Sequence, residues 1–506
     1  MLLLLPEIIV GCGALLVSIL GAGFARPGRS AVFGWTAFAF CLLSLITLPV
    51  SYHLTSALRL FPPPWISLAL SFDSFALFFR FFALASTSIV ILSSLDYLRA
   101  RALPHSGEFY GLLLFSTLGI MLLAAAVDLI TIILSLEMLS ISCYVLTAFI
   151  KRDERSAEGG LKYFLVGAIS TAVMLYGLSL LFGATGATSL AGIATGLRIT
   201  RVTVLPILGV VLTLVGFGFK VALVPFHAWS PDAYEGAPTP VTAFLSVGPK
   251  AAGFAVLSRI FLTSFSPTLA SWPSLFAGLS IVTMTVGNLL AIPQTNIKRM
   301  LAYSSISQAG YVLIGLVCAV PWAGSALLRS VPPAAGGLSP AVGNPLFGVV
   351  ALLLYLLAYL FMNLGAFLVV IAVSRTTASD EIPAYAGLMQ TSPFLAVSLA
   401  IFFLSLAGVP PTGGFIGKFY LFGAAIGSGL WWLALAGVLN SVISLYYYFN
   451  VVRYMFFLHP KEAAARRPAL SLSFAICLCL AVTLLMALLP EGFISFARAA
   501  AYGLSR

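Results

Sequence analysis

Charged residues are scarce in this sequence. Asp, Glu, Lys and Arg make up 8% of the 506 residues, whereas roughly a quarter of the residues in soluble domains are charged. Hydrophobic residues make up 61%. These proportions exclude a soluble protein. The apolar runs are continuous rather than alternating, which excludes a transmembrane β-barrel and predicts an all-α polytopic membrane protein.

Motifs for redox or phosphoryl-transfer chemistry are also missing. We find no glycine fingerprint for dinucleotides, no P-loop and no haem or flavin signature. The six cysteines lie within apolar segments without C-x-x-C spacing, which argues against a metal or iron–sulfur site. We therefore expect no cofactor and no metal in this chain. The net charge of +11 comes mostly from short loops, so we predict no nucleic-acid partner.

Apolar stretches of about 18–25 residues predict about 14 transmembrane helices in a single integral membrane domain, residues 1–506. They centre near 3–24, 30–50, 70–94, 109–127, 128–150, 161–183, 204–228, 239–263, 273–293, 300–320, 346–373, 393–421, 430–457 and 469–489. The longer connections, 184–203 and 321–345, are rich in Gly, Ser, Thr and Pro, which is typical of irregular segments. Asp73 and Asp128 fall at span boundaries and are expected to be solvated or to cap helices.

The positions of Lys and Arg predict the orientation of the chain in the membrane. Fourteen of these residues lie in loops after odd-numbered spans, and six lie in the other loops and the C-terminal tail. Because cytoplasmic loops are enriched in Lys and Arg, we expect the odd loops in the cytoplasm. Both termini are then predicted to lie on the outer side.

Three of the seven lysines, Lys220, Lys250 and Lys418, lie deep in predicted spans. Lys220 lies in VLTLVGFGFKVALVPFHAWSPDAY (211–234), and Lys418 lies in LAGVPPTGGFIGKFYLF (406–422); glycine and proline interrupt both segments. Interrupted apolar segments in the two halves of a chain indicate a transporter with inverted repeats. A desolvated lysine can release its proton whereas arginine does not, so these lysines suit a proton carrier.

Other ionisable residues have two interpretations each. Glu137 lies in the middle of a predicted span, and we expect it to pair with Lys220, either to fix helix packing or to tune the charge of the lysine. His227 is a possible proton relay or a loop-facing histidine with satisfied hydrogen bonds. Lys162 is a further candidate, or else its side chain extends to the membrane surface. Glu158 lies four residues before Lys162, a spacing that suits an ion pair on a helix.

Four segments of the sequence together resemble a known family. They are EGGLKYFLVGAISTAVMLYGLSLLFGATGATSL, KVALVPFHAWSPDAYEGAPTPVTAFLSVGPKAAGF, NIKRMLAYSSISQAGYVLIGL and GVPPTGGFIGKFYLF. They are similar to the antiporter-like membrane subunits of bacterial proton-pumping NADH:quinone oxidoreductase (respiratory complex I), over roughly residues 70–460. The LKYF…LYG…ATG run resembles the subunit N branch, and Lys418 departs from subunit M, which usually has glutamate there.

This resemblance implies a fold. It implies two inverted five-helix repeats, approximately residues 109–263 and 273–457, each with one broken helix. Helices in 1–94 and 469–506 would flank the repeats.

The resemblance also implies a mechanism and partners. Glu137 would pair with Lys220, Lys250 would be the middle relay, and Lys418 would serve the second half-channel. The chain would translocate protons in the membrane arm, driven by redox chemistry elsewhere, next to other membrane-arm subunits of complex I and the lipid bilayer. Quinone would be handled by other subunits, and the location would be the bacterial inner membrane or an equivalent energy-transducing membrane.

Three alternatives remain open at this stage. One is a subunit of a multi-subunit cation/proton antiporter, which sodium-sensitive transport would reveal. Another is a stand-alone secondary transporter, which would need a midplane cavity with substrate-recognition groups. The third is a structural membrane scaffold, in which substitutions of the buried lysines would have no effect on transport.

Overall fold

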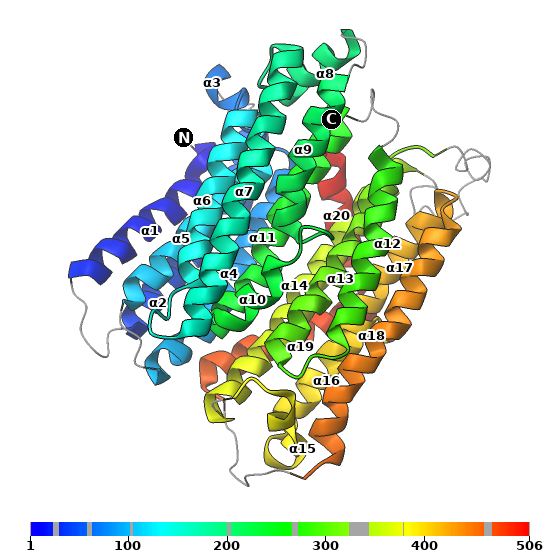
Figure 1. The fold of residues 1–506 in the computed structure, drawn as a ribbon. Coiled ribbons are helices and arrows are strands. Elements are labelled where there is room, and N and C mark those ends of the chain that lie inside the picture. Colours follow the sequence, from blue (N-terminus) through cyan, green and yellow to red (C-terminus); the bar gives the residue numbers. More distant parts are fainter. Residues whose placement is uncertain are drawn as a thin grey trace. The chain divides into compact units, whose positions relative to one another are not determined.

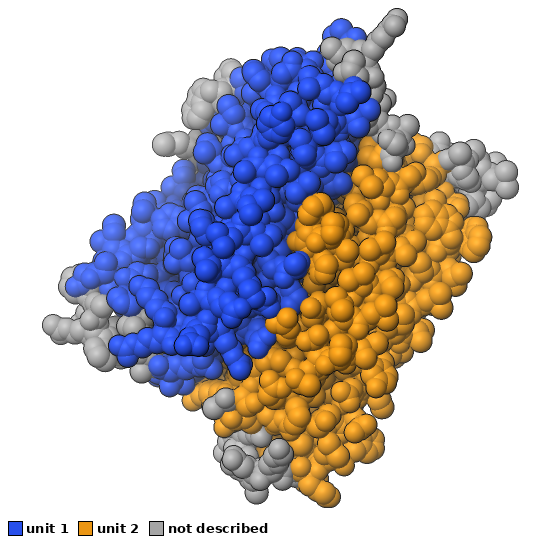
Figure 2. All heavy atoms as spheres, in the orientation of Figure 1, with its two compact units in different colours: residues 1–221, 228–269 blue, residues 222–227, 270–506 orange. Residues whose placement is uncertain are grey.

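The fold of this chain is helical throughout the described residues, and it divides into two compact units. The computed structural model describes residues 2–23, 30–57, 63–101, 105–199, 204–265, 272–322, 344–377, 379–459 and 468–504. Within these ranges every regular element is a helix (Figure 1). Unit 1 comprises residues 1–221 and 228–269, and unit 2 comprises residues 222–227 and 270–506 (Figure 2).

Unit 1 contains eleven α-helices among its described residues, together with a 3-10 turn, Leu2–Leu4, and a π-helical turn, Ile260–Phe265. The α-helices are α1 (Leu5–Gly23), α2 (Ser30–Ala57), α3 (Pro64–Ser67), α4 (Ser74–Ala100), α5 (Ser106–Ala125), α6 (Leu129–Thr147), α7 (Glu154–Thr185), α8 (Leu190–Ile199), α9 (Val204–Val221), α10 (Trp229–Gly236) and α11 (Thr239–Arg259). Helix α11 is buried along its whole length, and it packs against α4, α5 and α9. It is therefore the central helix of this unit.

Unit 2 has a similar centre, formed by α14. Its described helices are α12 (Trp272–Ala291), α13 (Ile297–Val317), α14 (Pro345–Thr377), a 3-10 turn Ile382–Tyr385, α15 (Leu388–Thr391), α16 (Pro393–Ala407), α17 (Gly413–Gly427), α18 (Trp431–Phe457), α19 (Leu470–Leu488) and α20 (Pro490–Leu504). Helix α14 packs against α13, α16, α17, α19 and α20. The membrane-spanning part of α14 is completely buried, so the core of unit 2 is built around this helix.

The predicted number of spans is confirmed. In the described part of the chain, 13 helices are long and apolar enough to cross a membrane. The remaining predicted stretch, 393–421, consists of α16 and α17, which have 15 residues each. The adjacent predicted stretches 109–127 and 128–150 are separate helices, α5 and α6. The chain is thus an integral membrane protein, and the assignment of its helices to inverted repeats stays a prediction.

The first predicted helix break is confirmed between α9 and α10. Helix α9 ends at Val221, directly after Lys220. Ala222 has a positive φ of 60°, and the Val224–Pro225 peptide bond is cis. Helix α10 begins at Trp229. The indole N–H of Trp229 donates a hydrogen bond to the carbonyl oxygen of Phe219 at 3.0 Å. A carbonyl in the last turn of α9 is therefore paired by a side chain of the next helix.

The second predicted break is confirmed between α16 and α17. Helix α16 ends at Ala407, and Gly408 follows with a φ of 87°, a left-handed conformation in which glycine avoids the clash of a Cβ atom. The Pro410–Pro411 peptide bond is cis, and α17 begins at Gly413. A proline has no backbone N–H to continue a helix, so the composition of this segment accounts for the interruption.

The prediction of an irregular connection at 184–203 is wrong, because this segment contains α8. Leu190, Ile193 and Leu197 are its buried residues, and their spacing places them on one face of a helix. Ser264 donates a hydrogen bond to the carbonyl oxygen of Leu190 at 3.0 Å, next to the π-helical turn. Packing of this short apolar face outweighs the high glycine and threonine content. Most of 321–345 lies outside the described residues.

Both boundary aspartates cap helices, as predicted. The Asp73 carboxylate accepts from the backbone N–H of Ala76 at the start of α4, at 2.7 Å. The Asp128 carboxylate accepts from the N–H of Ile130 at the start of α6, at 2.9 Å. Each cap pairs a backbone N–H that has no partner within its own helix.

The orientation predicted from Lys and Arg stays a prediction. Several of the residues on which it depends lie outside the described residues, namely Arg26, Arg29, Arg59, Arg201, Arg329, Lys461, Arg466, Arg467 and Arg506.

Two buried ion pairs in unit 1 were not foreseen from the sequence. Arg80 on α4 lies 2.7 Å from the Glu7 carboxylate on α1. Arg259 at the end of α11 binds Asp73 with both terminal nitrogens, at 2.8 and 3.1 Å, and also donates to the carbonyl oxygen of Ala124. Burial opposes ionisation of Asp73, but the charge and hydrogen bonds of Arg259 outweigh it and lower the pKa of Asp73 below its usual value.

We expect Arg259→Met to lower the stability of the chain by about 3–5 kcal/mol, because the Asp73 carboxylate then stays buried without its cation. The double variant Asp73→Asn with Arg259→Met should recover much of this loss. Since the pKa of Asp73 is lowered by folding, the contribution of the pair is present above about pH 4 and is lost only at lower pH. Thermal unfolding measured at pH 6 and pH 8 checks this, and wild-type melting of the single variant would contradict it.

Candidate functional site

Lys220 is buried at the end of α9, with 2% of its surface exposed. Its Nζ donates a hydrogen bond to Oγ of Ser140 on α6 at 3.0 Å. Ser140 in turn donates to the carbonyl oxygen of Leu136 at 2.7 Å. The carbonyl end of a helix has partial negative charge, which favours a cation there. Lys220 is therefore held by a hydroxyl group and a helix terminus.

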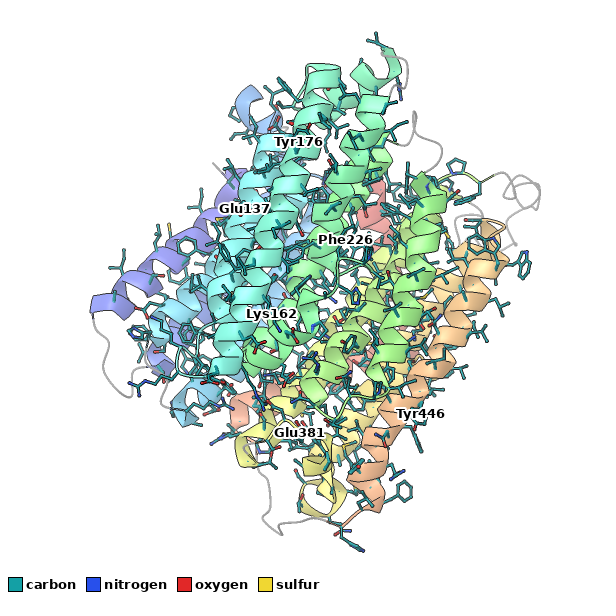
Figure 3. All side chains as sticks on the ribbon, in the orientation of Figure 1. Glu137, Lys162, Tyr176, Phe226, Glu381 and Tyr446 are labelled. Atoms are coloured by element: carbon teal, nitrogen blue, oxygen red, sulfur yellow. The ribbon has the colours of Figure 1, made fainter. Side chains whose placement is uncertain are left out.

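Glu137 lies one turn before Ser140 on α6 (Figure 3). Among the described residues, its carboxylate forms no direct ion pair with Lys220, whose hydrogen bond goes to Ser140. Its Oε1 is buried and has no hydrogen-bond partner among the described residues. The carboxylate still interacts electrostatically with the Lys220 ammonium. Lys220 of α9 thus contacts α6 at Ser140, one turn after Glu137, and Ser140 is the direct contact of the lysine.

Lys250 lies in the middle of α11, directly after Pro249, and 2% of its surface is exposed. Its Nζ is 5.9 Å from the centre of the Tyr234 ring on α10, a cation–π distance. Pro249 has no N–H for the carbonyl oxygen of Leu245, one turn earlier, so this oxygen loses its usual helical partner. Like Lys220, Lys250 lies where the regular helical hydrogen bonding is interrupted.

Lys162 has a different environment from the buried lysines. On α7 (Figure 3), its side chain is 46% exposed and its Nζ lies 2.7 Å from Glu158 and 2.8 Å from Asp232. The predicted pair with Glu158 is confirmed. Asp232 belongs to α10, so Lys162 links α7 to the helix that follows the first break.

His227 lies in the segment between α9 and α10, which belongs to unit 2. Its Nδ1 is buried and has no hydrogen-bond partner in the part of the chain that the structure describes. An imidazole nitrogen without a partner suits a group that exchanges protons with water, and its role as a relay stays a prediction.

Lys418 is buried on α17, next to the second break, with 3% of its surface exposed. Its Nζ donates to the carbonyl oxygen of Ala407, the last residue of α16, at 2.9 Å, and to Oγ of Ser441 on α18 at 3.1 Å. The ammonium also lies 4.3 Å from the centre of the Tyr311 ring. The carbonyl oxygen of Ala407, which is left free by the break, therefore bonds the lysine, and the role of Lys418 in a second half-channel stays a prediction.

A largely apolar cavity of about 700 Å³ opens beside Lys418. Lys418 and Ser441 are among the residues that line it, and Phe419 and Val442 contribute apolar walls. Phe419 is 63% exposed and Val442 is 61% exposed. The cavity wall thus combines the buried lysine with exposed apolar side chains.

Sequence reasoning missed a network of neutral polar side chains in unit 2. Ser441 donates to the Tyr311 hydroxyl at 3.1 Å, and Tyr311 donates to the carbonyl oxygen of Gly437 at 3.3 Å. Gln308, one turn before Tyr311 on α13, donates to the carbonyl oxygen of Leu406 at 3.1 Å and accepts from the Tyr355 hydroxyl.

The network continues towards the start of α13. Tyr448 contacts Ser304, and Tyr359 donates to Ser305 at 2.8 Å. Polar residues at positions 304, 308 and 311 of one apolar span share a helix face, and this spacing is the sequence signal that identifies the network.

In the described ranges, no group of three or more His, Cys, Asp or Glu side chains is placed to hold a metal ion. The lysine amines, the hydroxyl groups around them and the His227 imidazole are groups that can bind or donate a proton.

The chain matches a family of membrane subunits over most of its length. The family model described as NADH:quinone oxidoreductase/Mrp antiporter, TM matches residues 126–332 and 338–444. NADH-quinone oxidoreductase subunit N of Trichlorobacter lovleyi is 43% identical over 452 residues, which cover 88% of this chain and 81% of that protein.

Two solved structures have the same fold. A chain of respiratory complex I from Thermus thermophilus with bound aureothin has a TM-score of 0.77 and 30% identity. The match covers 97% of this chain and 98% of the Thermus chain. A chain of the Mrp complex from Dietzia sp. DQ12-45-1b has a TM-score of 0.82 and 20% identity. The match covers 99% of this chain and 97% of the Dietzia chain. The chain therefore belongs to the NADH:quinone oxidoreductase/Mrp antiporter family of membrane subunits, and within it to the subunit N branch.

Proposed function

We propose that this chain translocates protons as a membrane-arm subunit of an NADH:quinone oxidoreductase, and that Lys220, Lys250 and Lys418 are the groups that bind and release them. The observation that supports this most is the environment of Lys220 and Lys418. Both amines are buried next to a helix break, and their hydrogen-bond acceptors are a serine hydroxyl or a backbone carbonyl instead of a carboxylate.

Neutral partners allow a lysine to change its charge. A serine hydroxyl accepts a hydrogen bond from the ammonium and can donate one to the neutral amine after the proton leaves. A carboxylate in direct contact would instead stabilise the charged lysine and hold the proton. Ser140 and Ser441 therefore suit a site that cycles between two protonation states.

Glu137 would act on Lys220 from a short distance. An anion near the ammonium favours its charged form, and the hydrogen bond of Lys220 goes to Ser140, one turn along α6 from Glu137. A change in the position of Glu137 relative to this contact would alter how readily Lys220 releases its proton.

In unit 2, Ser441 and Tyr311 extend from Lys418 as hydroxyl groups that can relay a proton. Gln308 and the tyrosines around it continue the polar network along α13. Such hydroxyl chains combine donors and acceptors at each step. We infer that protons reach or leave Lys418 along this face of α13.

The redox chemistry belongs to other subunits. The relative from Trichlorobacter lovleyi is named as a subunit of NADH-quinone oxidoreductase, and the Thermus thermophilus structure is a whole respiratory complex. We infer that the partners of this chain are other membrane subunits of such a complex, and that its termini face the outer side. The antiporter alternative is less well supported, because the Mrp chain shares the fold at only 20% identity.

We expect Lys220→Ala to abolish most proton pumping by the assembled complex, because a methyl group cannot bind a proton. Lys220→Arg should also impair pumping, since a guanidinium group does not release its proton. Lys162→Arg is the matched control, because its exposed ion pairs with Glu158 and Asp232 need only a cation. Acidification driven by NADH in membrane vesicles, normalised to assembled complex, measures all three; normal pumping by the Lys220→Arg complex would remove Lys220 as a carrier.

We expect Ser140→Ala to reduce pumping about tenfold, because loss of a hydrogen bond to a charged group costs on the order of 1.5–3 kcal/mol. Glu137→Gln should reduce pumping as well, while the complex still assembles. The matched control is Ser142→Ala, because Ser142 lies on the same helix and donates only to the carbonyl oxygen of Met138. If the Glu137→Gln complex pumps at the wild-type rate, Glu137 has only a packing role.

We expect Tyr311→Phe to slow pumping severalfold, because it removes the hydroxyl that bonds Ser441 but keeps the ring beside Lys418. Tyr311→Leu should slow it further, since a cation–π contact of a desolvated ammonium contributes about 2 kcal/mol. Tyr446→Phe is the control on α18, because Tyr446 is 65% exposed (Figure 3). Equal rates for Tyr311→Phe and wild type would exclude this hydroxyl from the proton route.

A further inference from the structure

A second cavity, of about 770 Å³, lies in unit 1 where the end of α4, the start of α5 and the end of α6 meet. None of the residues that we propose to bind protons lines it. The cavity is partly open, and its lining combines basic side chains with apolar ones. These two parts differ in what they can bind.

The basic part of the cavity contains Arg101, Lys151 and Arg152. None of these three side chains forms an ion pair with an acidic residue within the described ranges. Arg155, a few residues further along, is instead paired with Glu235 at 3.6 Å. Among the described residues, the three cations in the cavity therefore have no counter-ion, in contrast to Arg155.

The acidic side chain in the lining, Glu108, has its own partner. Its Oε2 lies 2.8 Å from Nδ1 of His105. The cavity therefore has an excess of positive charge even with Glu108 included. This excess favours an anionic ligand.

The start of α5 adds backbone donors to the same place. Helix α5 has 20 residues and begins at Ser106, and its N-cap residue His105 makes no side-chain cap hydrogen bond. The first N–H groups of a helix have no partner within the helix and favour an anion. His105 and Glu108, on either side of this terminus, both line the cavity.

The apolar part of the cavity includes Leu112, Val145 and Phe149. Val145 is 48% exposed, and Ile141, one turn earlier on α6, is 56% exposed. Leu134 extends the same exposed apolar strip along α6, which is a candidate membrane span. The cavity therefore opens onto an apolar surface long enough for an acyl chain.

We propose that this cavity binds the headgroup of an anionic phospholipid. The lipid phosphate contacts Arg101, Lys151 and Arg152, and an acyl chain lies on the exposed strip of α6. Basic pockets between transmembrane helices at the cytoplasmic side bind such headgroups. A free phosphate ion shares the headgroup chemistry, but it would leave the apolar strip unused.

The experiment uses the whole complex, reconstituted with phosphatidylglycerol that has a photoactivatable group in its acyl chain. Irradiation followed by peptide mapping should place the label on α5 and α6, around Leu112 and Val145.

Each basic side chain contributes about fivefold to binding. The triple variant Arg101→Gln, Lys151→Gln, Arg152→Gln should therefore lower labelling on the order of a hundredfold. The matched control, Arg375→Gln with Arg453→Gln, removes two exposed basic residues of unit 2 and should leave labelling unchanged.

Competitors distinguish the sources of the phosphate. Unlabelled phosphatidylglycerol should displace the probe, whereas phosphatidylcholine and inorganic phosphate should not. Displacement by inorganic phosphate, or equal labelling by a phosphatidylcholine probe, would overturn the proposal. If the triple variant does not assemble, Val145→Trp tests the same site by filling its exposed apolar wall, and undiminished labelling of that variant would also overturn it.

Discussion

Burial of lysine amines at membrane depth is the constraint on which this structure depends. An ammonium group there needs hydrogen-bond acceptors, and a regular helix uses its own carbonyl groups within the backbone. The two helix breaks release such acceptors. Lys418 bonds the carbonyl oxygen of Ala407 at the end of α16, and Lys220 lies at the carbonyl end of α9. The glycine and proline residues at the breaks are therefore part of the lysine sites.

The ionic contacts of the chain fall into two kinds. Arg259 with Asp73, and Arg80 with Glu7, are direct pairs of opposite charge that join helices within unit 1. Arginine keeps its charge, so these pairs hold the fold in one state. Lys220 and Lys418 bond hydroxyl and carbonyl oxygens instead, whereas the buried Lys298 lies 3.7 Å from the Asp380 carboxylate. Lys220 and Lys418 thus differ from Arg80 and Arg259 in having uncharged hydrogen-bond acceptors, and a hydroxyl group can bond a lysine in either protonation state.

In unit 2 the described surroundings of Lys418 are polar without further charges. Ser441 bonds both Lys418 and Tyr311, and Gln308, one turn before Tyr311 on α13, forms its own hydrogen bonds with Leu406 and Tyr355. A hydroxyl group both donates and accepts, so a row of them costs less to bury than a row of ionised groups. Gln308 also satisfies the Leu406 carbonyl at the end of α16, which ties this network to the second helix break.

The sequence by itself determined the membrane fold, the number of spans, both helix breaks and the burial of Lys220, Lys250 and Lys418. Long apolar runs, proline and glycine have strong local effects, which is why these features could be predicted. Only the tertiary structure decided which side chains meet. It placed Ser140 rather than Glu137 against Lys220, paired Asp73 with Arg259, and formed α8 in a segment that composition marks as irregular. Such contacts join residues far apart in the chain, and their geometry follows from how helices pack, which local patterns do not contain.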